Sequence, residues 1–560
     1  MSDLSSSSFT SRRSPVFARR GAVASSQPLA SQAGLSILMA GGDAADAAVA
    51  TAAALNVTEP CSTGIGGDCF SLYFDSATGK ITALNGSGRS PAGLTRELVL
   101  GQGLAEGDTF RNPYHAHTVT VPGACAGWCD LVERHGTMPL ATVLAPAIRL
   151  AEDGFPVSPI TSYYWSRGAA AQLAISAGGR ALTLDGRGPR PGEIFRNPGL
   201  ARTLREVADG GAEAFYRGTV GSDIARAIQE QGGVMTREDL AAHRSRWEDP
   251  IGVGYRGMTI WECPPNGQGL AALLALAILD GMNVGREPFS SVNRWHTIIE
   301  AVRLGFADAL ACVADPEIAP APLARLLSGA YAQKRRASID PSHAALQTLP
   351  GSPLADAARP GSDTVYFCVV DGRGNACSFI NSNYMGFGTG IVPSASQGRS
   401  KGESWGFSLQ NRGLNFSLAP DLPNTLAPRK RPYHTIIPGM ITRADGTLMG
   451  PFGVMGGFMQ PQGHVQVVSA LLDDRLDPQT ALDRPRFYVD PSGAHPGVHI
   501  EEGTPTSVVE GLSARGHRVL PGIGGYDRSL FGRGQIITRN RDGVLCAGSD
   551  PRADGCAMGF

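Results

Sequence analysis

The sequence has few of the features that mark several large classes of protein. Its 560 residues include ten cysteines but no CxxC pair, so neither a zinc site nor a disulfide scaffold is predicted. No HExxH motif and no EF-hand loop occurs. The net charge is −1, which gives no electrostatic reason to expect nucleic acid or an anionic membrane as a partner.

Long apolar segments are missing as well. No stretch approaches the roughly 18 apolar residues of a transmembrane helix. The first 33 residues are rich in Ser and Arg and lack the apolar core of a signal peptide. These absences predict a cytoplasmic protein without a membrane partner, and the composition of residues 1–25 predicts disorder there.

Glycine, in contrast, is abundant, with 72 residues in the chain. Such a content is typical of many tight turns or of close approaches between the backbone and a ligand. Residues 41–330 are rich in helical patterns and residues 364–550 in strand patterns. Composition alone allows either separate domains or one α+β unit.

A predicted β-hairpin forms the most informative local pattern. Val365–Val370 is a run of β-branched and aromatic residues, typical of a buried strand. Asp371–Asn375 has turn chemistry, and Ala376–Ile380 reads as the second strand. Residues 351–362 are rich in Pro, Gly, Ala and Ser and predict a loop. Thr364 therefore stands at the boundary between a loop and a buried strand.

A threonine in this place has a chemical use if the chain is cut just before it. Thr364 would then carry both a hydroxyl and a free α-amine, whose reference pKa of about 8 suits a base near neutral pH. Such a residue is a self-activated nucleophile. An ordinary threonine at the start of a strand is the simpler interpretation, and the residue type alone does not decide.

The surrounding sequence resembles a known family. TVYFCVVDGRGNA, which begins at Thr364, and the later FGTGIVP are similar to the start of the small subunit in the gamma-glutamyltranspeptidase family of N-terminal nucleophile hydrolases. The segments GGDAADAAVA and EPCSTGIGGD, some 300 residues earlier, resemble a second signature of that family, and GSDPR at Gly548–Arg552 resembles its C-terminus. The resemblance covers residues 30 to 560.

The resemblance implies a fold and a processing event. The expected fold is the α/β (α+β) four-layer αββα sandwich of N-terminal nucleophile hydrolases. The precursor is expected to cleave itself between Asp363 and Thr364. This leaves a large subunit, 1–363, and a small subunit, 364–560, interlocked in one structural domain. The expected partner is therefore each fragment's own counterpart in a heterodimer, with further oligomerisation left open.

The family also implies catalytic roles. Thr364 is the expected nucleophile, with its own α-amine as general base, and Ser382 supplies a hydroxyl that assists self-cleavage. Gly456 and Gly457 are expected to direct backbone N–H groups at the oxyanion, because a Gly-Gly turn allows close approach without a side chain. No metal or organic cofactor is expected.

The predicted substrate-binding residues depart from the family pattern. Arg89 lies two residues after the family's carboxylate-binding arginine, at whose position this chain has Ser87, so a surface arginine is the competing interpretation. His434 and Thr435 stand where the family has two serines, and both can still donate hydrogen bonds. Tyr384 is also assigned to substrate binding.

The largest departures are Asn415, which replaces an expected carboxylate, and Arg412, which replaces a glutamine. Asn415 offers only a neutral carbonyl to a substrate ammonium, and Arg412 would repel it. The family favours γ-glutamyl amides such as glutathione, to be hydrolysed or transferred to an amine. The departures favour dicarboxylic monoamides, such as glutaryl compounds, and a non-catalytic binding homologue is the third hypothesis.

Overall fold

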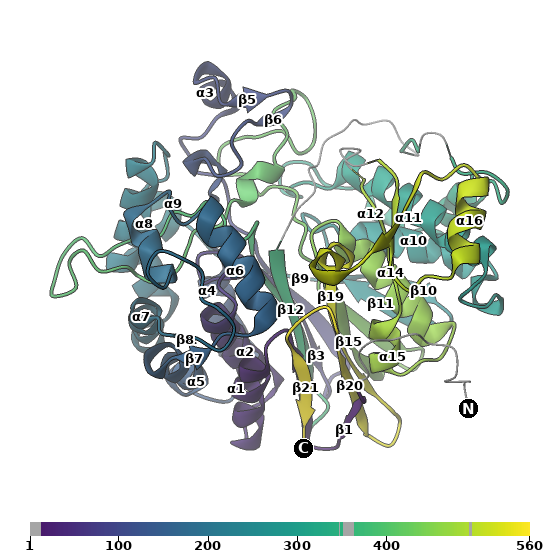
Figure 1. Cartoon of the computed structure of the whole chain (residues 1–560), viewed down its shortest axis with the longest axis horizontal. Helices are drawn as coiled ribbons and strands as arrows, with labels where there is room; N and C mark the ends of the chain where they lie inside the picture. Colours follow the sequence, from purple (N-terminus) through teal and green to yellow (C-terminus); the bar gives the residue numbers. More distant parts are fainter. Residues whose placement is uncertain (1–12, 346–347, 351–362, 492–495) are drawn as a thin grey trace.

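The computed structural model describes residues 13–345, 348–350, 363–491 and 496–560. Two seven-stranded sheets lie between two groups of helices (Figure 1). All neighbouring strands within each of these two sheets are antiparallel. The described residues include no helix that is both long and apolar enough to cross a membrane.

The first sheet contains the predicted hairpin. From edge to edge, its strands are β21 (Cys556–Gly559), β2 (Gly21–Ser25), β12 (Asp363–Asp371), β13 (Ala376–Tyr384), β3 (Asp68–Asp75), β4 (Lys80–Gly86) and β9 (Arg246–Glu248). The second sheet consists of β1 (Val16–Ala18), β20 (Leu545–Ser549), β19 (Arg533–Arg539), β15 (Leu448–Met455), β14 (Gly439–Arg443), β11 (Met258–Glu262) and β10 (Ile251–Tyr255).

Helices cover the outer face of each sheet (Figure 1). Those beside the first sheet are α1 (Pro28–Met39), α2 (Ala44–Thr58), α4 (Ala124–His135), α5 (Leu140–Asp153), α6 (Pro159–Ala171), α7 (Pro198–Arg217), α8 (Thr219–Glu230) and α9 (Arg237–Ala241). Those beside the second sheet are α10 (Gly269–Asp280), α11 (Val292–Cys312), α12 (Leu323–Leu326), α13 (Gly329–Arg336), α14 (Met459–Leu472), α15 (Pro478–Asp483) and α16 (Thr506–Ala514).

Smaller elements lie outside these layers. They are α3 (Arg96–Gly101), the pairs β5 (Ala105–Glu106) with β6 (Thr109–Phe110) and β7 (Phe155–Pro156) with β8 (Ile194–Phe195), and a three-stranded sheet of β16 (Phe487–Val489), β17 (Val498–Glu501) and β18 (Val519–Ile523).

Separate hydrophobic cores fill the spaces between the layers. Phe70 and Tyr366 from the first sheet meet Met440 and Ile537 from the second in a core between the two sheets. A second core joins the first sheet to its helices, and a third joins the second sheet to α10, α11 and α14. Because apolar surface is buried on both faces of each sheet, the αββα sandwich expected from the sequence is confirmed.

Local sequence explains the two elements nearest the site. Every residue of α2 is buried, since its alanines let the helix pack closely, and Asp43 caps its N-terminus as predicted. In the hairpin turn, the carboxylate of Asp371 accepts hydrogen bonds from the backbone N–H groups of Arg373 and Asn375. Gly374 takes a φ of +89°, which glycine adopts without steric cost.

The prediction of disorder over residues 1–25 is wrong for its described part. Residues 16–18 form β1, which pairs with β20, and residues 21–25 form β2, which is fully buried between β12 and β21. The Ser- and Arg-rich composition dominated the sequence-based interpretation. Pairing with strands several hundred residues away overrides that local signal.

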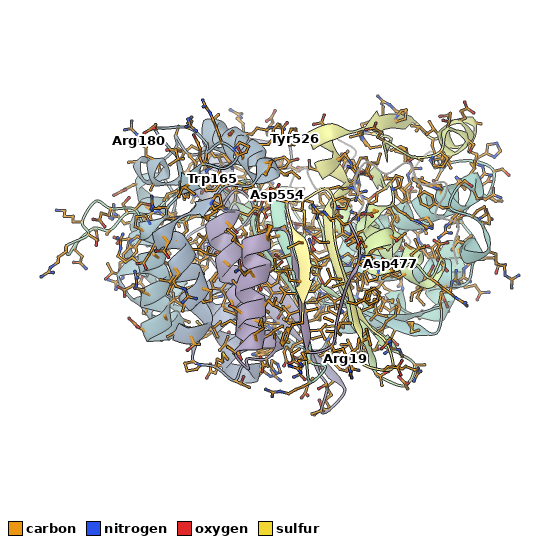
Figure 2. All side chains as sticks on the ribbon, turned by 60° about the horizontal axis from the view of Figure 1, so that its bottom comes forward. Arg19, Trp165, Arg180, Asp477, Tyr526 and Asp554 are labelled. Carbon is orange, nitrogen blue, oxygen red and sulfur yellow. The ribbon has the colours of Figure 1, made fainter. Side chains whose placement is uncertain are left out.

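Both sheets combine strands from before and after the expected cleavage point. In the first sheet β12 and β13 lie between β2 and β3, and in the second β14 pairs with β11. The C-terminal segment is also fixed to the earlier helices. Asp554, which is labelled in Figure 2, lies in this segment. It accepts hydrogen bonds from the backbone N–H groups of Ile160 and Thr161 at the start of α6.

Candidate active site

The predicted nucleophile lies at the start of β12. Thr364 is fully buried, and its Oγ1 lies 2.9 Å from the Oγ of Ser382 in β13. Ser382 Oγ also accepts a hydrogen bond of 2.8 Å from the backbone N–H of Tyr384. Tyr384 has a φ of +77°, a backbone conformation that is uncommon for a residue with a side chain and that is often found at functional sites.

The next strand of the sheet places a carboxylate beside Ser382. Asp68, the first residue of β3, is the register partner of Ser382 and is fully buried. Its Oδ2 accepts a hydrogen bond of 3.0 Å from Nε2 of His434. Its Oδ1 accepts from Gln410 Nε2 at 2.9 Å and from the backbone N–H of Gly88 at 3.2 Å. Protein donors therefore engage both oxygens.

Burial sets the charge state of this pair. Burial raises the pKa of Asp68 to about 7, although the nearby Arg412 guanidinium favours the ionised form. Burial and Arg412 also lower the pKa of His434 well below its usual range, so the imidazole is neutral. Its Nδ1 accepts from the backbone N–H of Ile436 at 3.4 Å, which assigns the proton to Nε2.

Arg412 is the buried cation of the site. It lies in a short 3-10 helix, Arg412–Asn415, and is fully buried. Its Nη1 donates to Thr435 Oγ1 at 2.7 Å, and its guanidinium lies 4.4 Å from the ring centre of Tyr384. Within the described residues its Nε and Nη2 have no hydrogen-bond partner. Burial lowers its pKa to about 10, so it stays charged at neutral pH.

Asn415 holds the segment that contains His434 and Thr435. Its Nδ2 donates to the carbonyl of Tyr433 at 3.0 Å, so this amide nitrogen is engaged by the backbone. Among the described residues, the site thus combines a guanidinium that has two unpartnered nitrogens with a carboxylate, that of Asp68, whose oxygens already have donors. This arrangement suits an anionic group better than an ammonium.

The Gly456-Gly457 turn connects β15 to α14. Both glycines have positive φ, +130° and +58°. Gln268 Nε2 donates to the carbonyl of Gly457 at 2.8 Å and to the carbonyl of Thr435 at 2.6 Å. Gln268 Oε1 accepts from the hydroxyl of Tyr433 at 3.0 Å. A single buried side chain therefore joins the predicted oxyanion turn to the segment that contacts Arg412.

Arg89 lies outside this group of contacts. Its guanidinium donates to Asp315 at 2.8 Å, to Glu317 at 2.5 Å and to the carbonyl of Arg429 at 2.8 Å. Ser87, at the position of the family's arginine, accepts from Asn266 Nδ2 at 3.0 Å. The structure therefore brings Thr364, Ser382, Tyr384, Arg412, Asn415, His434, Thr435 and Gly457 into one connected set and places Arg89 in another.

A comparison with known protein families assigns the chain to one of them. Residues 30–560 match the family model described as gamma-glutamyltranspeptidase. The chain belongs to the gamma-glutamyltranspeptidase family. The resemblance that the sequence motifs predicted is confirmed.

Individual relatives extend this result. The chain is 36% identical over 547 residues to the glutathione hydrolase-like YwrD proenzyme of Bacillus subtilis (strain 168), covering 97% of this chain and 99% of the relative. It is 33% identical over 540 residues to the oxamate amidohydrolase proenzyme of Klebsiella pneumoniae subsp. pneumoniae, covering 95% and 97%. The crystal structure of cephalosporin acylase from Bacillus halodurans superposes with a TM-score of 0.89 at 44% identity, covering 100% and 99%. These relatives confirm the prediction of an enzyme.

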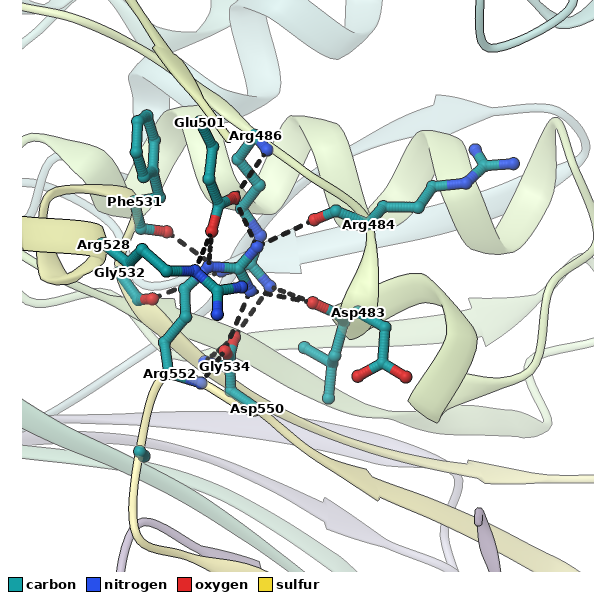
Figure 3. A network of polar contacts seen from close by, with 12 residues as sticks. Asp483, Arg484, Arg486, Glu501, Arg528, Phe531, Gly532, Gly534, Asp550 and Arg552 are labelled. Carbon is teal, nitrogen blue, oxygen red and sulfur yellow. Dashed lines mark hydrogen bonds and ion pairs between the residues drawn. The ribbon is translucent and has the colours of Figure 1, made fainter. Parts of the chain in front are cut away.

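In this gamma-glutamyltranspeptidase family member, the C-terminal GSDPR block forms a buried ionic network (Figure 3). Arg552 contacts Glu501 at 2.5 Å and Asp550 at 2.9 Å, and Arg486 contacts Asp550 at 2.8 Å. Burial raises the pKa of Asp550, but the Arg486 and Arg552 guanidinium groups outweigh this effect and lower the pKa to about 2. Asp550 Oδ2 also accepts the backbone N–H of Gly534 at 2.8 Å.

This network also supports the Gly456-Gly457 turn. Arg486 Nη1 donates to the carbonyl of Phe531 at 2.9 Å, which fixes the segment before β19. A Cβ at Gly456 would lie only 3.2 Å from the Cα of Gly532 in that segment. The turn therefore has little room for a side chain at position 456.

Sequence reasoning missed Asp68, Gln268 and Gln410. Asp68 carries a visible signal, since an acid directly before the apolar strand segment Cys69–Tyr73 is out of place unless it is paired or functional. Gln268 and Gln410 lie in irregular segments without a motif. Only their tertiary contacts identify them.

One group of potential metal ligands lies among the described residues. A nitrogen of His296, a nitrogen of His517 and an oxygen of Glu300 lie within 4.8 Å of one another. The two imidazoles hydrogen-bond each other at 2.8 Å, His296 Nε2 donates to the carbonyl of Asp340 at 2.7 Å, and Arg303 donates to Glu300 at 2.8 Å. These bonds account for the cluster, and the adjacent guanidinium opposes a cation, so we assign no metal to it.

Proposed function

We propose that this chain is a self-processing amidohydrolase that cleaves γ-glutamyl or similar amides, with Thr364 as its N-terminal nucleophile. The contact of 2.9 Å between Thr364 Oγ1 and Ser382 Oγ carries the proposal, since it gives a buried hydroxyl at a strand start an oriented partner. Family membership and the names of the relatives support it.

Processing comes first. The Thr364 hydroxyl attacks the carbonyl carbon of Asp363, the C–N bond to Thr364 breaks, and an ester replaces the amide. Water then hydrolyses this ester, which frees the Asp363 carboxylate and the α-amine of Thr364. The products are fragments 1–363 and 364–560. Each sheet contains strands from both fragments, which supports a heterodimer that stays assembled.

Catalysis repeats the same chemistry on a substrate. The α-amine of Thr364 accepts the proton of its hydroxyl as Oγ1 attacks the amide carbonyl. The Gly456 and Gly457 N–H groups stabilise the oxyanion, and the amine product leaves with the proton. Water, or an acceptor amine, then attacks the acyl ester and restores Thr364.

A dicarboxylic monoamide is the second candidate substrate class, and Arg412 favours it. Two N–H groups of a fully buried guanidinium lack partners, and a terminal carboxylate of the acyl group would satisfy them. An α-ammonium beside Arg412 would find the oxygens of Asp68 already bonded to His434 and Gln410. We therefore expect a glutaryl anilide to be hydrolysed faster than a γ-glutamyl anilide.

The intact mass of the purified protein tests the central claim. Wild type is expected as two fragments that meet at Asp363 and Thr364, whereas Thr364→Ala stays as one chain without amidase activity. A wild-type chain that remains uncut yet hydrolyses amides would refute the N-terminal nucleophile. A clear preference for the γ-glutamyl anilide would refute only the second candidate and leave the nucleophile in place.

A further inference from the structure

A polar cavity lies apart from the Thr364 site. Its volume is about 290 Å³, and none of Thr364, Ser382, Arg412 or the two glycines of the turn lines it. A buried water needs only about 10–15 Å³ of such space, so the cavity can hold a molecule of several atoms. We call it the arginine cavity because five arginines line it: Arg89, Arg244, Arg246, Arg429 and Arg431. His243 is also a lining residue.

Three acidic residues, Glu238, Asp239 and Glu317, line this cavity, and the last two are engaged by donors of the protein. Glu317 accepts from Arg89 at 2.5 Å and from Arg246 at 2.6 Å, so it is shared by two of the arginines. Asp239 accepts from the backbone N–H groups of Thr236 and Ala92, both at 2.9 Å. These acids therefore leave part of the positive charge without a close carboxylate partner.

Arg244 and Arg431 supply that remaining charge. Arg244 Nη1 donates only to the backbone carbonyls of Ala241 and His243. Arg431 is 3% exposed, and its Nε donates to the carbonyl of Ser87 at 3.1 Å. Its Nη1 has no hydrogen-bond partner among the described residues and lies 3.9 Å from the nearest carboxylate. A buried N–H group in this state is costly unless a ligand accepts from it.

His243 gives a second, independent observation. It is 7% exposed, lines the cavity, and its Nε2 has no hydrogen-bond partner among the described residues. Burial, together with Arg431, Arg244 and Arg89, lowers its pKa to about 3, so the ring is neutral and can donate one N–H. Two buried polar side chains, each with one nitrogen that has no hydrogen-bond partner among the described residues, thus line the same cavity.

We propose that the arginine cavity binds a small-molecule carboxylate, with Arg431, Arg244 and His243 as hydrogen-bond donors. The planar guanidinium matches the two oxygens of a carboxylate, and the neutral imidazole adds a donor without further charge. This inference does not depend on cleavage at Thr364. It assigns an anion site to residues that take no part in the proposed reaction.

The chain segment from Arg431 to Thr435 connects the arginine cavity to the residues around Arg412. Arg431 belongs to the same segment as Thr435, which contacts Arg412. The backbone N–H of Arg431 is held by Asp315 at 2.9 Å, and Asp315 is also bound by Arg89. A carboxylate bound in the cavity therefore contacts one end of the segment whose other end forms part of the acyl site.

Isothermal titration calorimetry with malonate, at constant ionic strength, tests the proposal on the full chain. We expect saturable binding to wild type, and a Kd about tenfold higher for Arg244→Gln, since a hydrogen bond from a charged donor is lost. Arg429→Gln is the second cavity variant. Arg541→Gln, whose side chain is 74% exposed, is the matched control and should leave the Kd unchanged.

The outcomes separate cleanly. Arg244 and Arg429 are exposed residues, so neither substitution removes a core contact, and unchanged melting temperatures will show that the variants fold. A higher Kd for malonate in the two cavity variants, together with an unchanged Kd in Arg541→Gln, supports the site. An absence of saturable malonate binding overturns it, and so does binding that both cavity variants leave unchanged, which would place malonate outside the cavity.

Discussion

Arg412→Gln is the substitution that most directly tests how the acyl group is held. The change removes a buried cation whose Nε and Nη2 are free to bind a substrate carboxylate. It also removes the bond to Thr435 Oγ1 and the stacking on Tyr384. The glutamine amide can replace one donor but not the charge.

The expected loss follows from these contacts. A hydrogen bond to a charged group contributes roughly 1.5–3 kcal/mol, and two of them are at stake, one of which glutamine can partly replace. We therefore expect a loss of about 3 kcal/mol, or about 100-fold in kcat/KM, for a glutaryl p-nitroanilide. Arg412→Lys keeps the charge without the planar fork and should lose less.

A matched substrate distinguishes recognition from general damage. Valeryl p-nitroanilide has a methyl group in place of the glutaryl carboxylate, so Arg412→Gln should lower its kcat/KM far less. Intact mass first establishes that each variant is processed. An equal loss for both substrates in a processed variant would show that Arg412 supports the structure of the site and does not bind the carboxylate.

Three further predictions concern groups around this centre. Gln268→Leu should lower kcat at least about tenfold, because the carbonyls of Thr435 and Gly457 lose their shared donor. The control Gln333→Leu, at an exposed position, should leave kcat unchanged. An unchanged kcat in Gln268→Leu would show that Gln268 does not position these carbonyls. Asp68 has a folded-state pKa of about 7, above its ordinary value of 3.8, so its contribution to stability is fully present below pH 3.8 and is lost as the pH rises through about 7. The melting temperature of Asp68→Asn should therefore rise relative to that of wild type as the pH increases over that interval. A difference in melting temperature that does not change with pH would contradict the raised pKa. Arg552→Met should cost about 3–5 kcal/mol in denaturant unfolding, since it removes one of the two arginine partners of each buried carboxylate, Glu501 and Asp550, while the exposed Arg541→Gln should change stability by less than about 1 kcal/mol.

Local sequence was enough to predict the hairpin and the place of Thr364. β-Branched residues on both strands and the Asp371–Asn375 turn agree with one another, and the turn fixes which residues pair. The fold itself could be predicted only because separated motifs resembled a family. Composition left the number of domains open, since it does not say which strands become neighbours.

Residues that depend on distant pairing were harder to predict. Asp68 becomes a neighbour of Ser382 through the register of β3 with β13, more than 300 residues away in the chain. Gln268 joins Thr435 to Gly457 from 167 and 189 residues away in the chain, and nothing in its local sequence indicates this. Arg89 shows the opposite case. Its residue type suited carboxylate binding, but two positions along a loop were enough to engage it with Asp315 and Glu317.

The position of Thr364 is consistent with one hydroxyl serving both the proposed processing and the proposed catalysis. From Val365 onward, β12 is held by β13 on one side and, from Cys368, by β2 on the other, so a cut before Thr364 removes none of those pairings. The new amine therefore appears at a fixed point beside its own hydroxyl. After the proposed cleavage, this amine is the base that the proposed mechanism requires, and no additional side chain is needed.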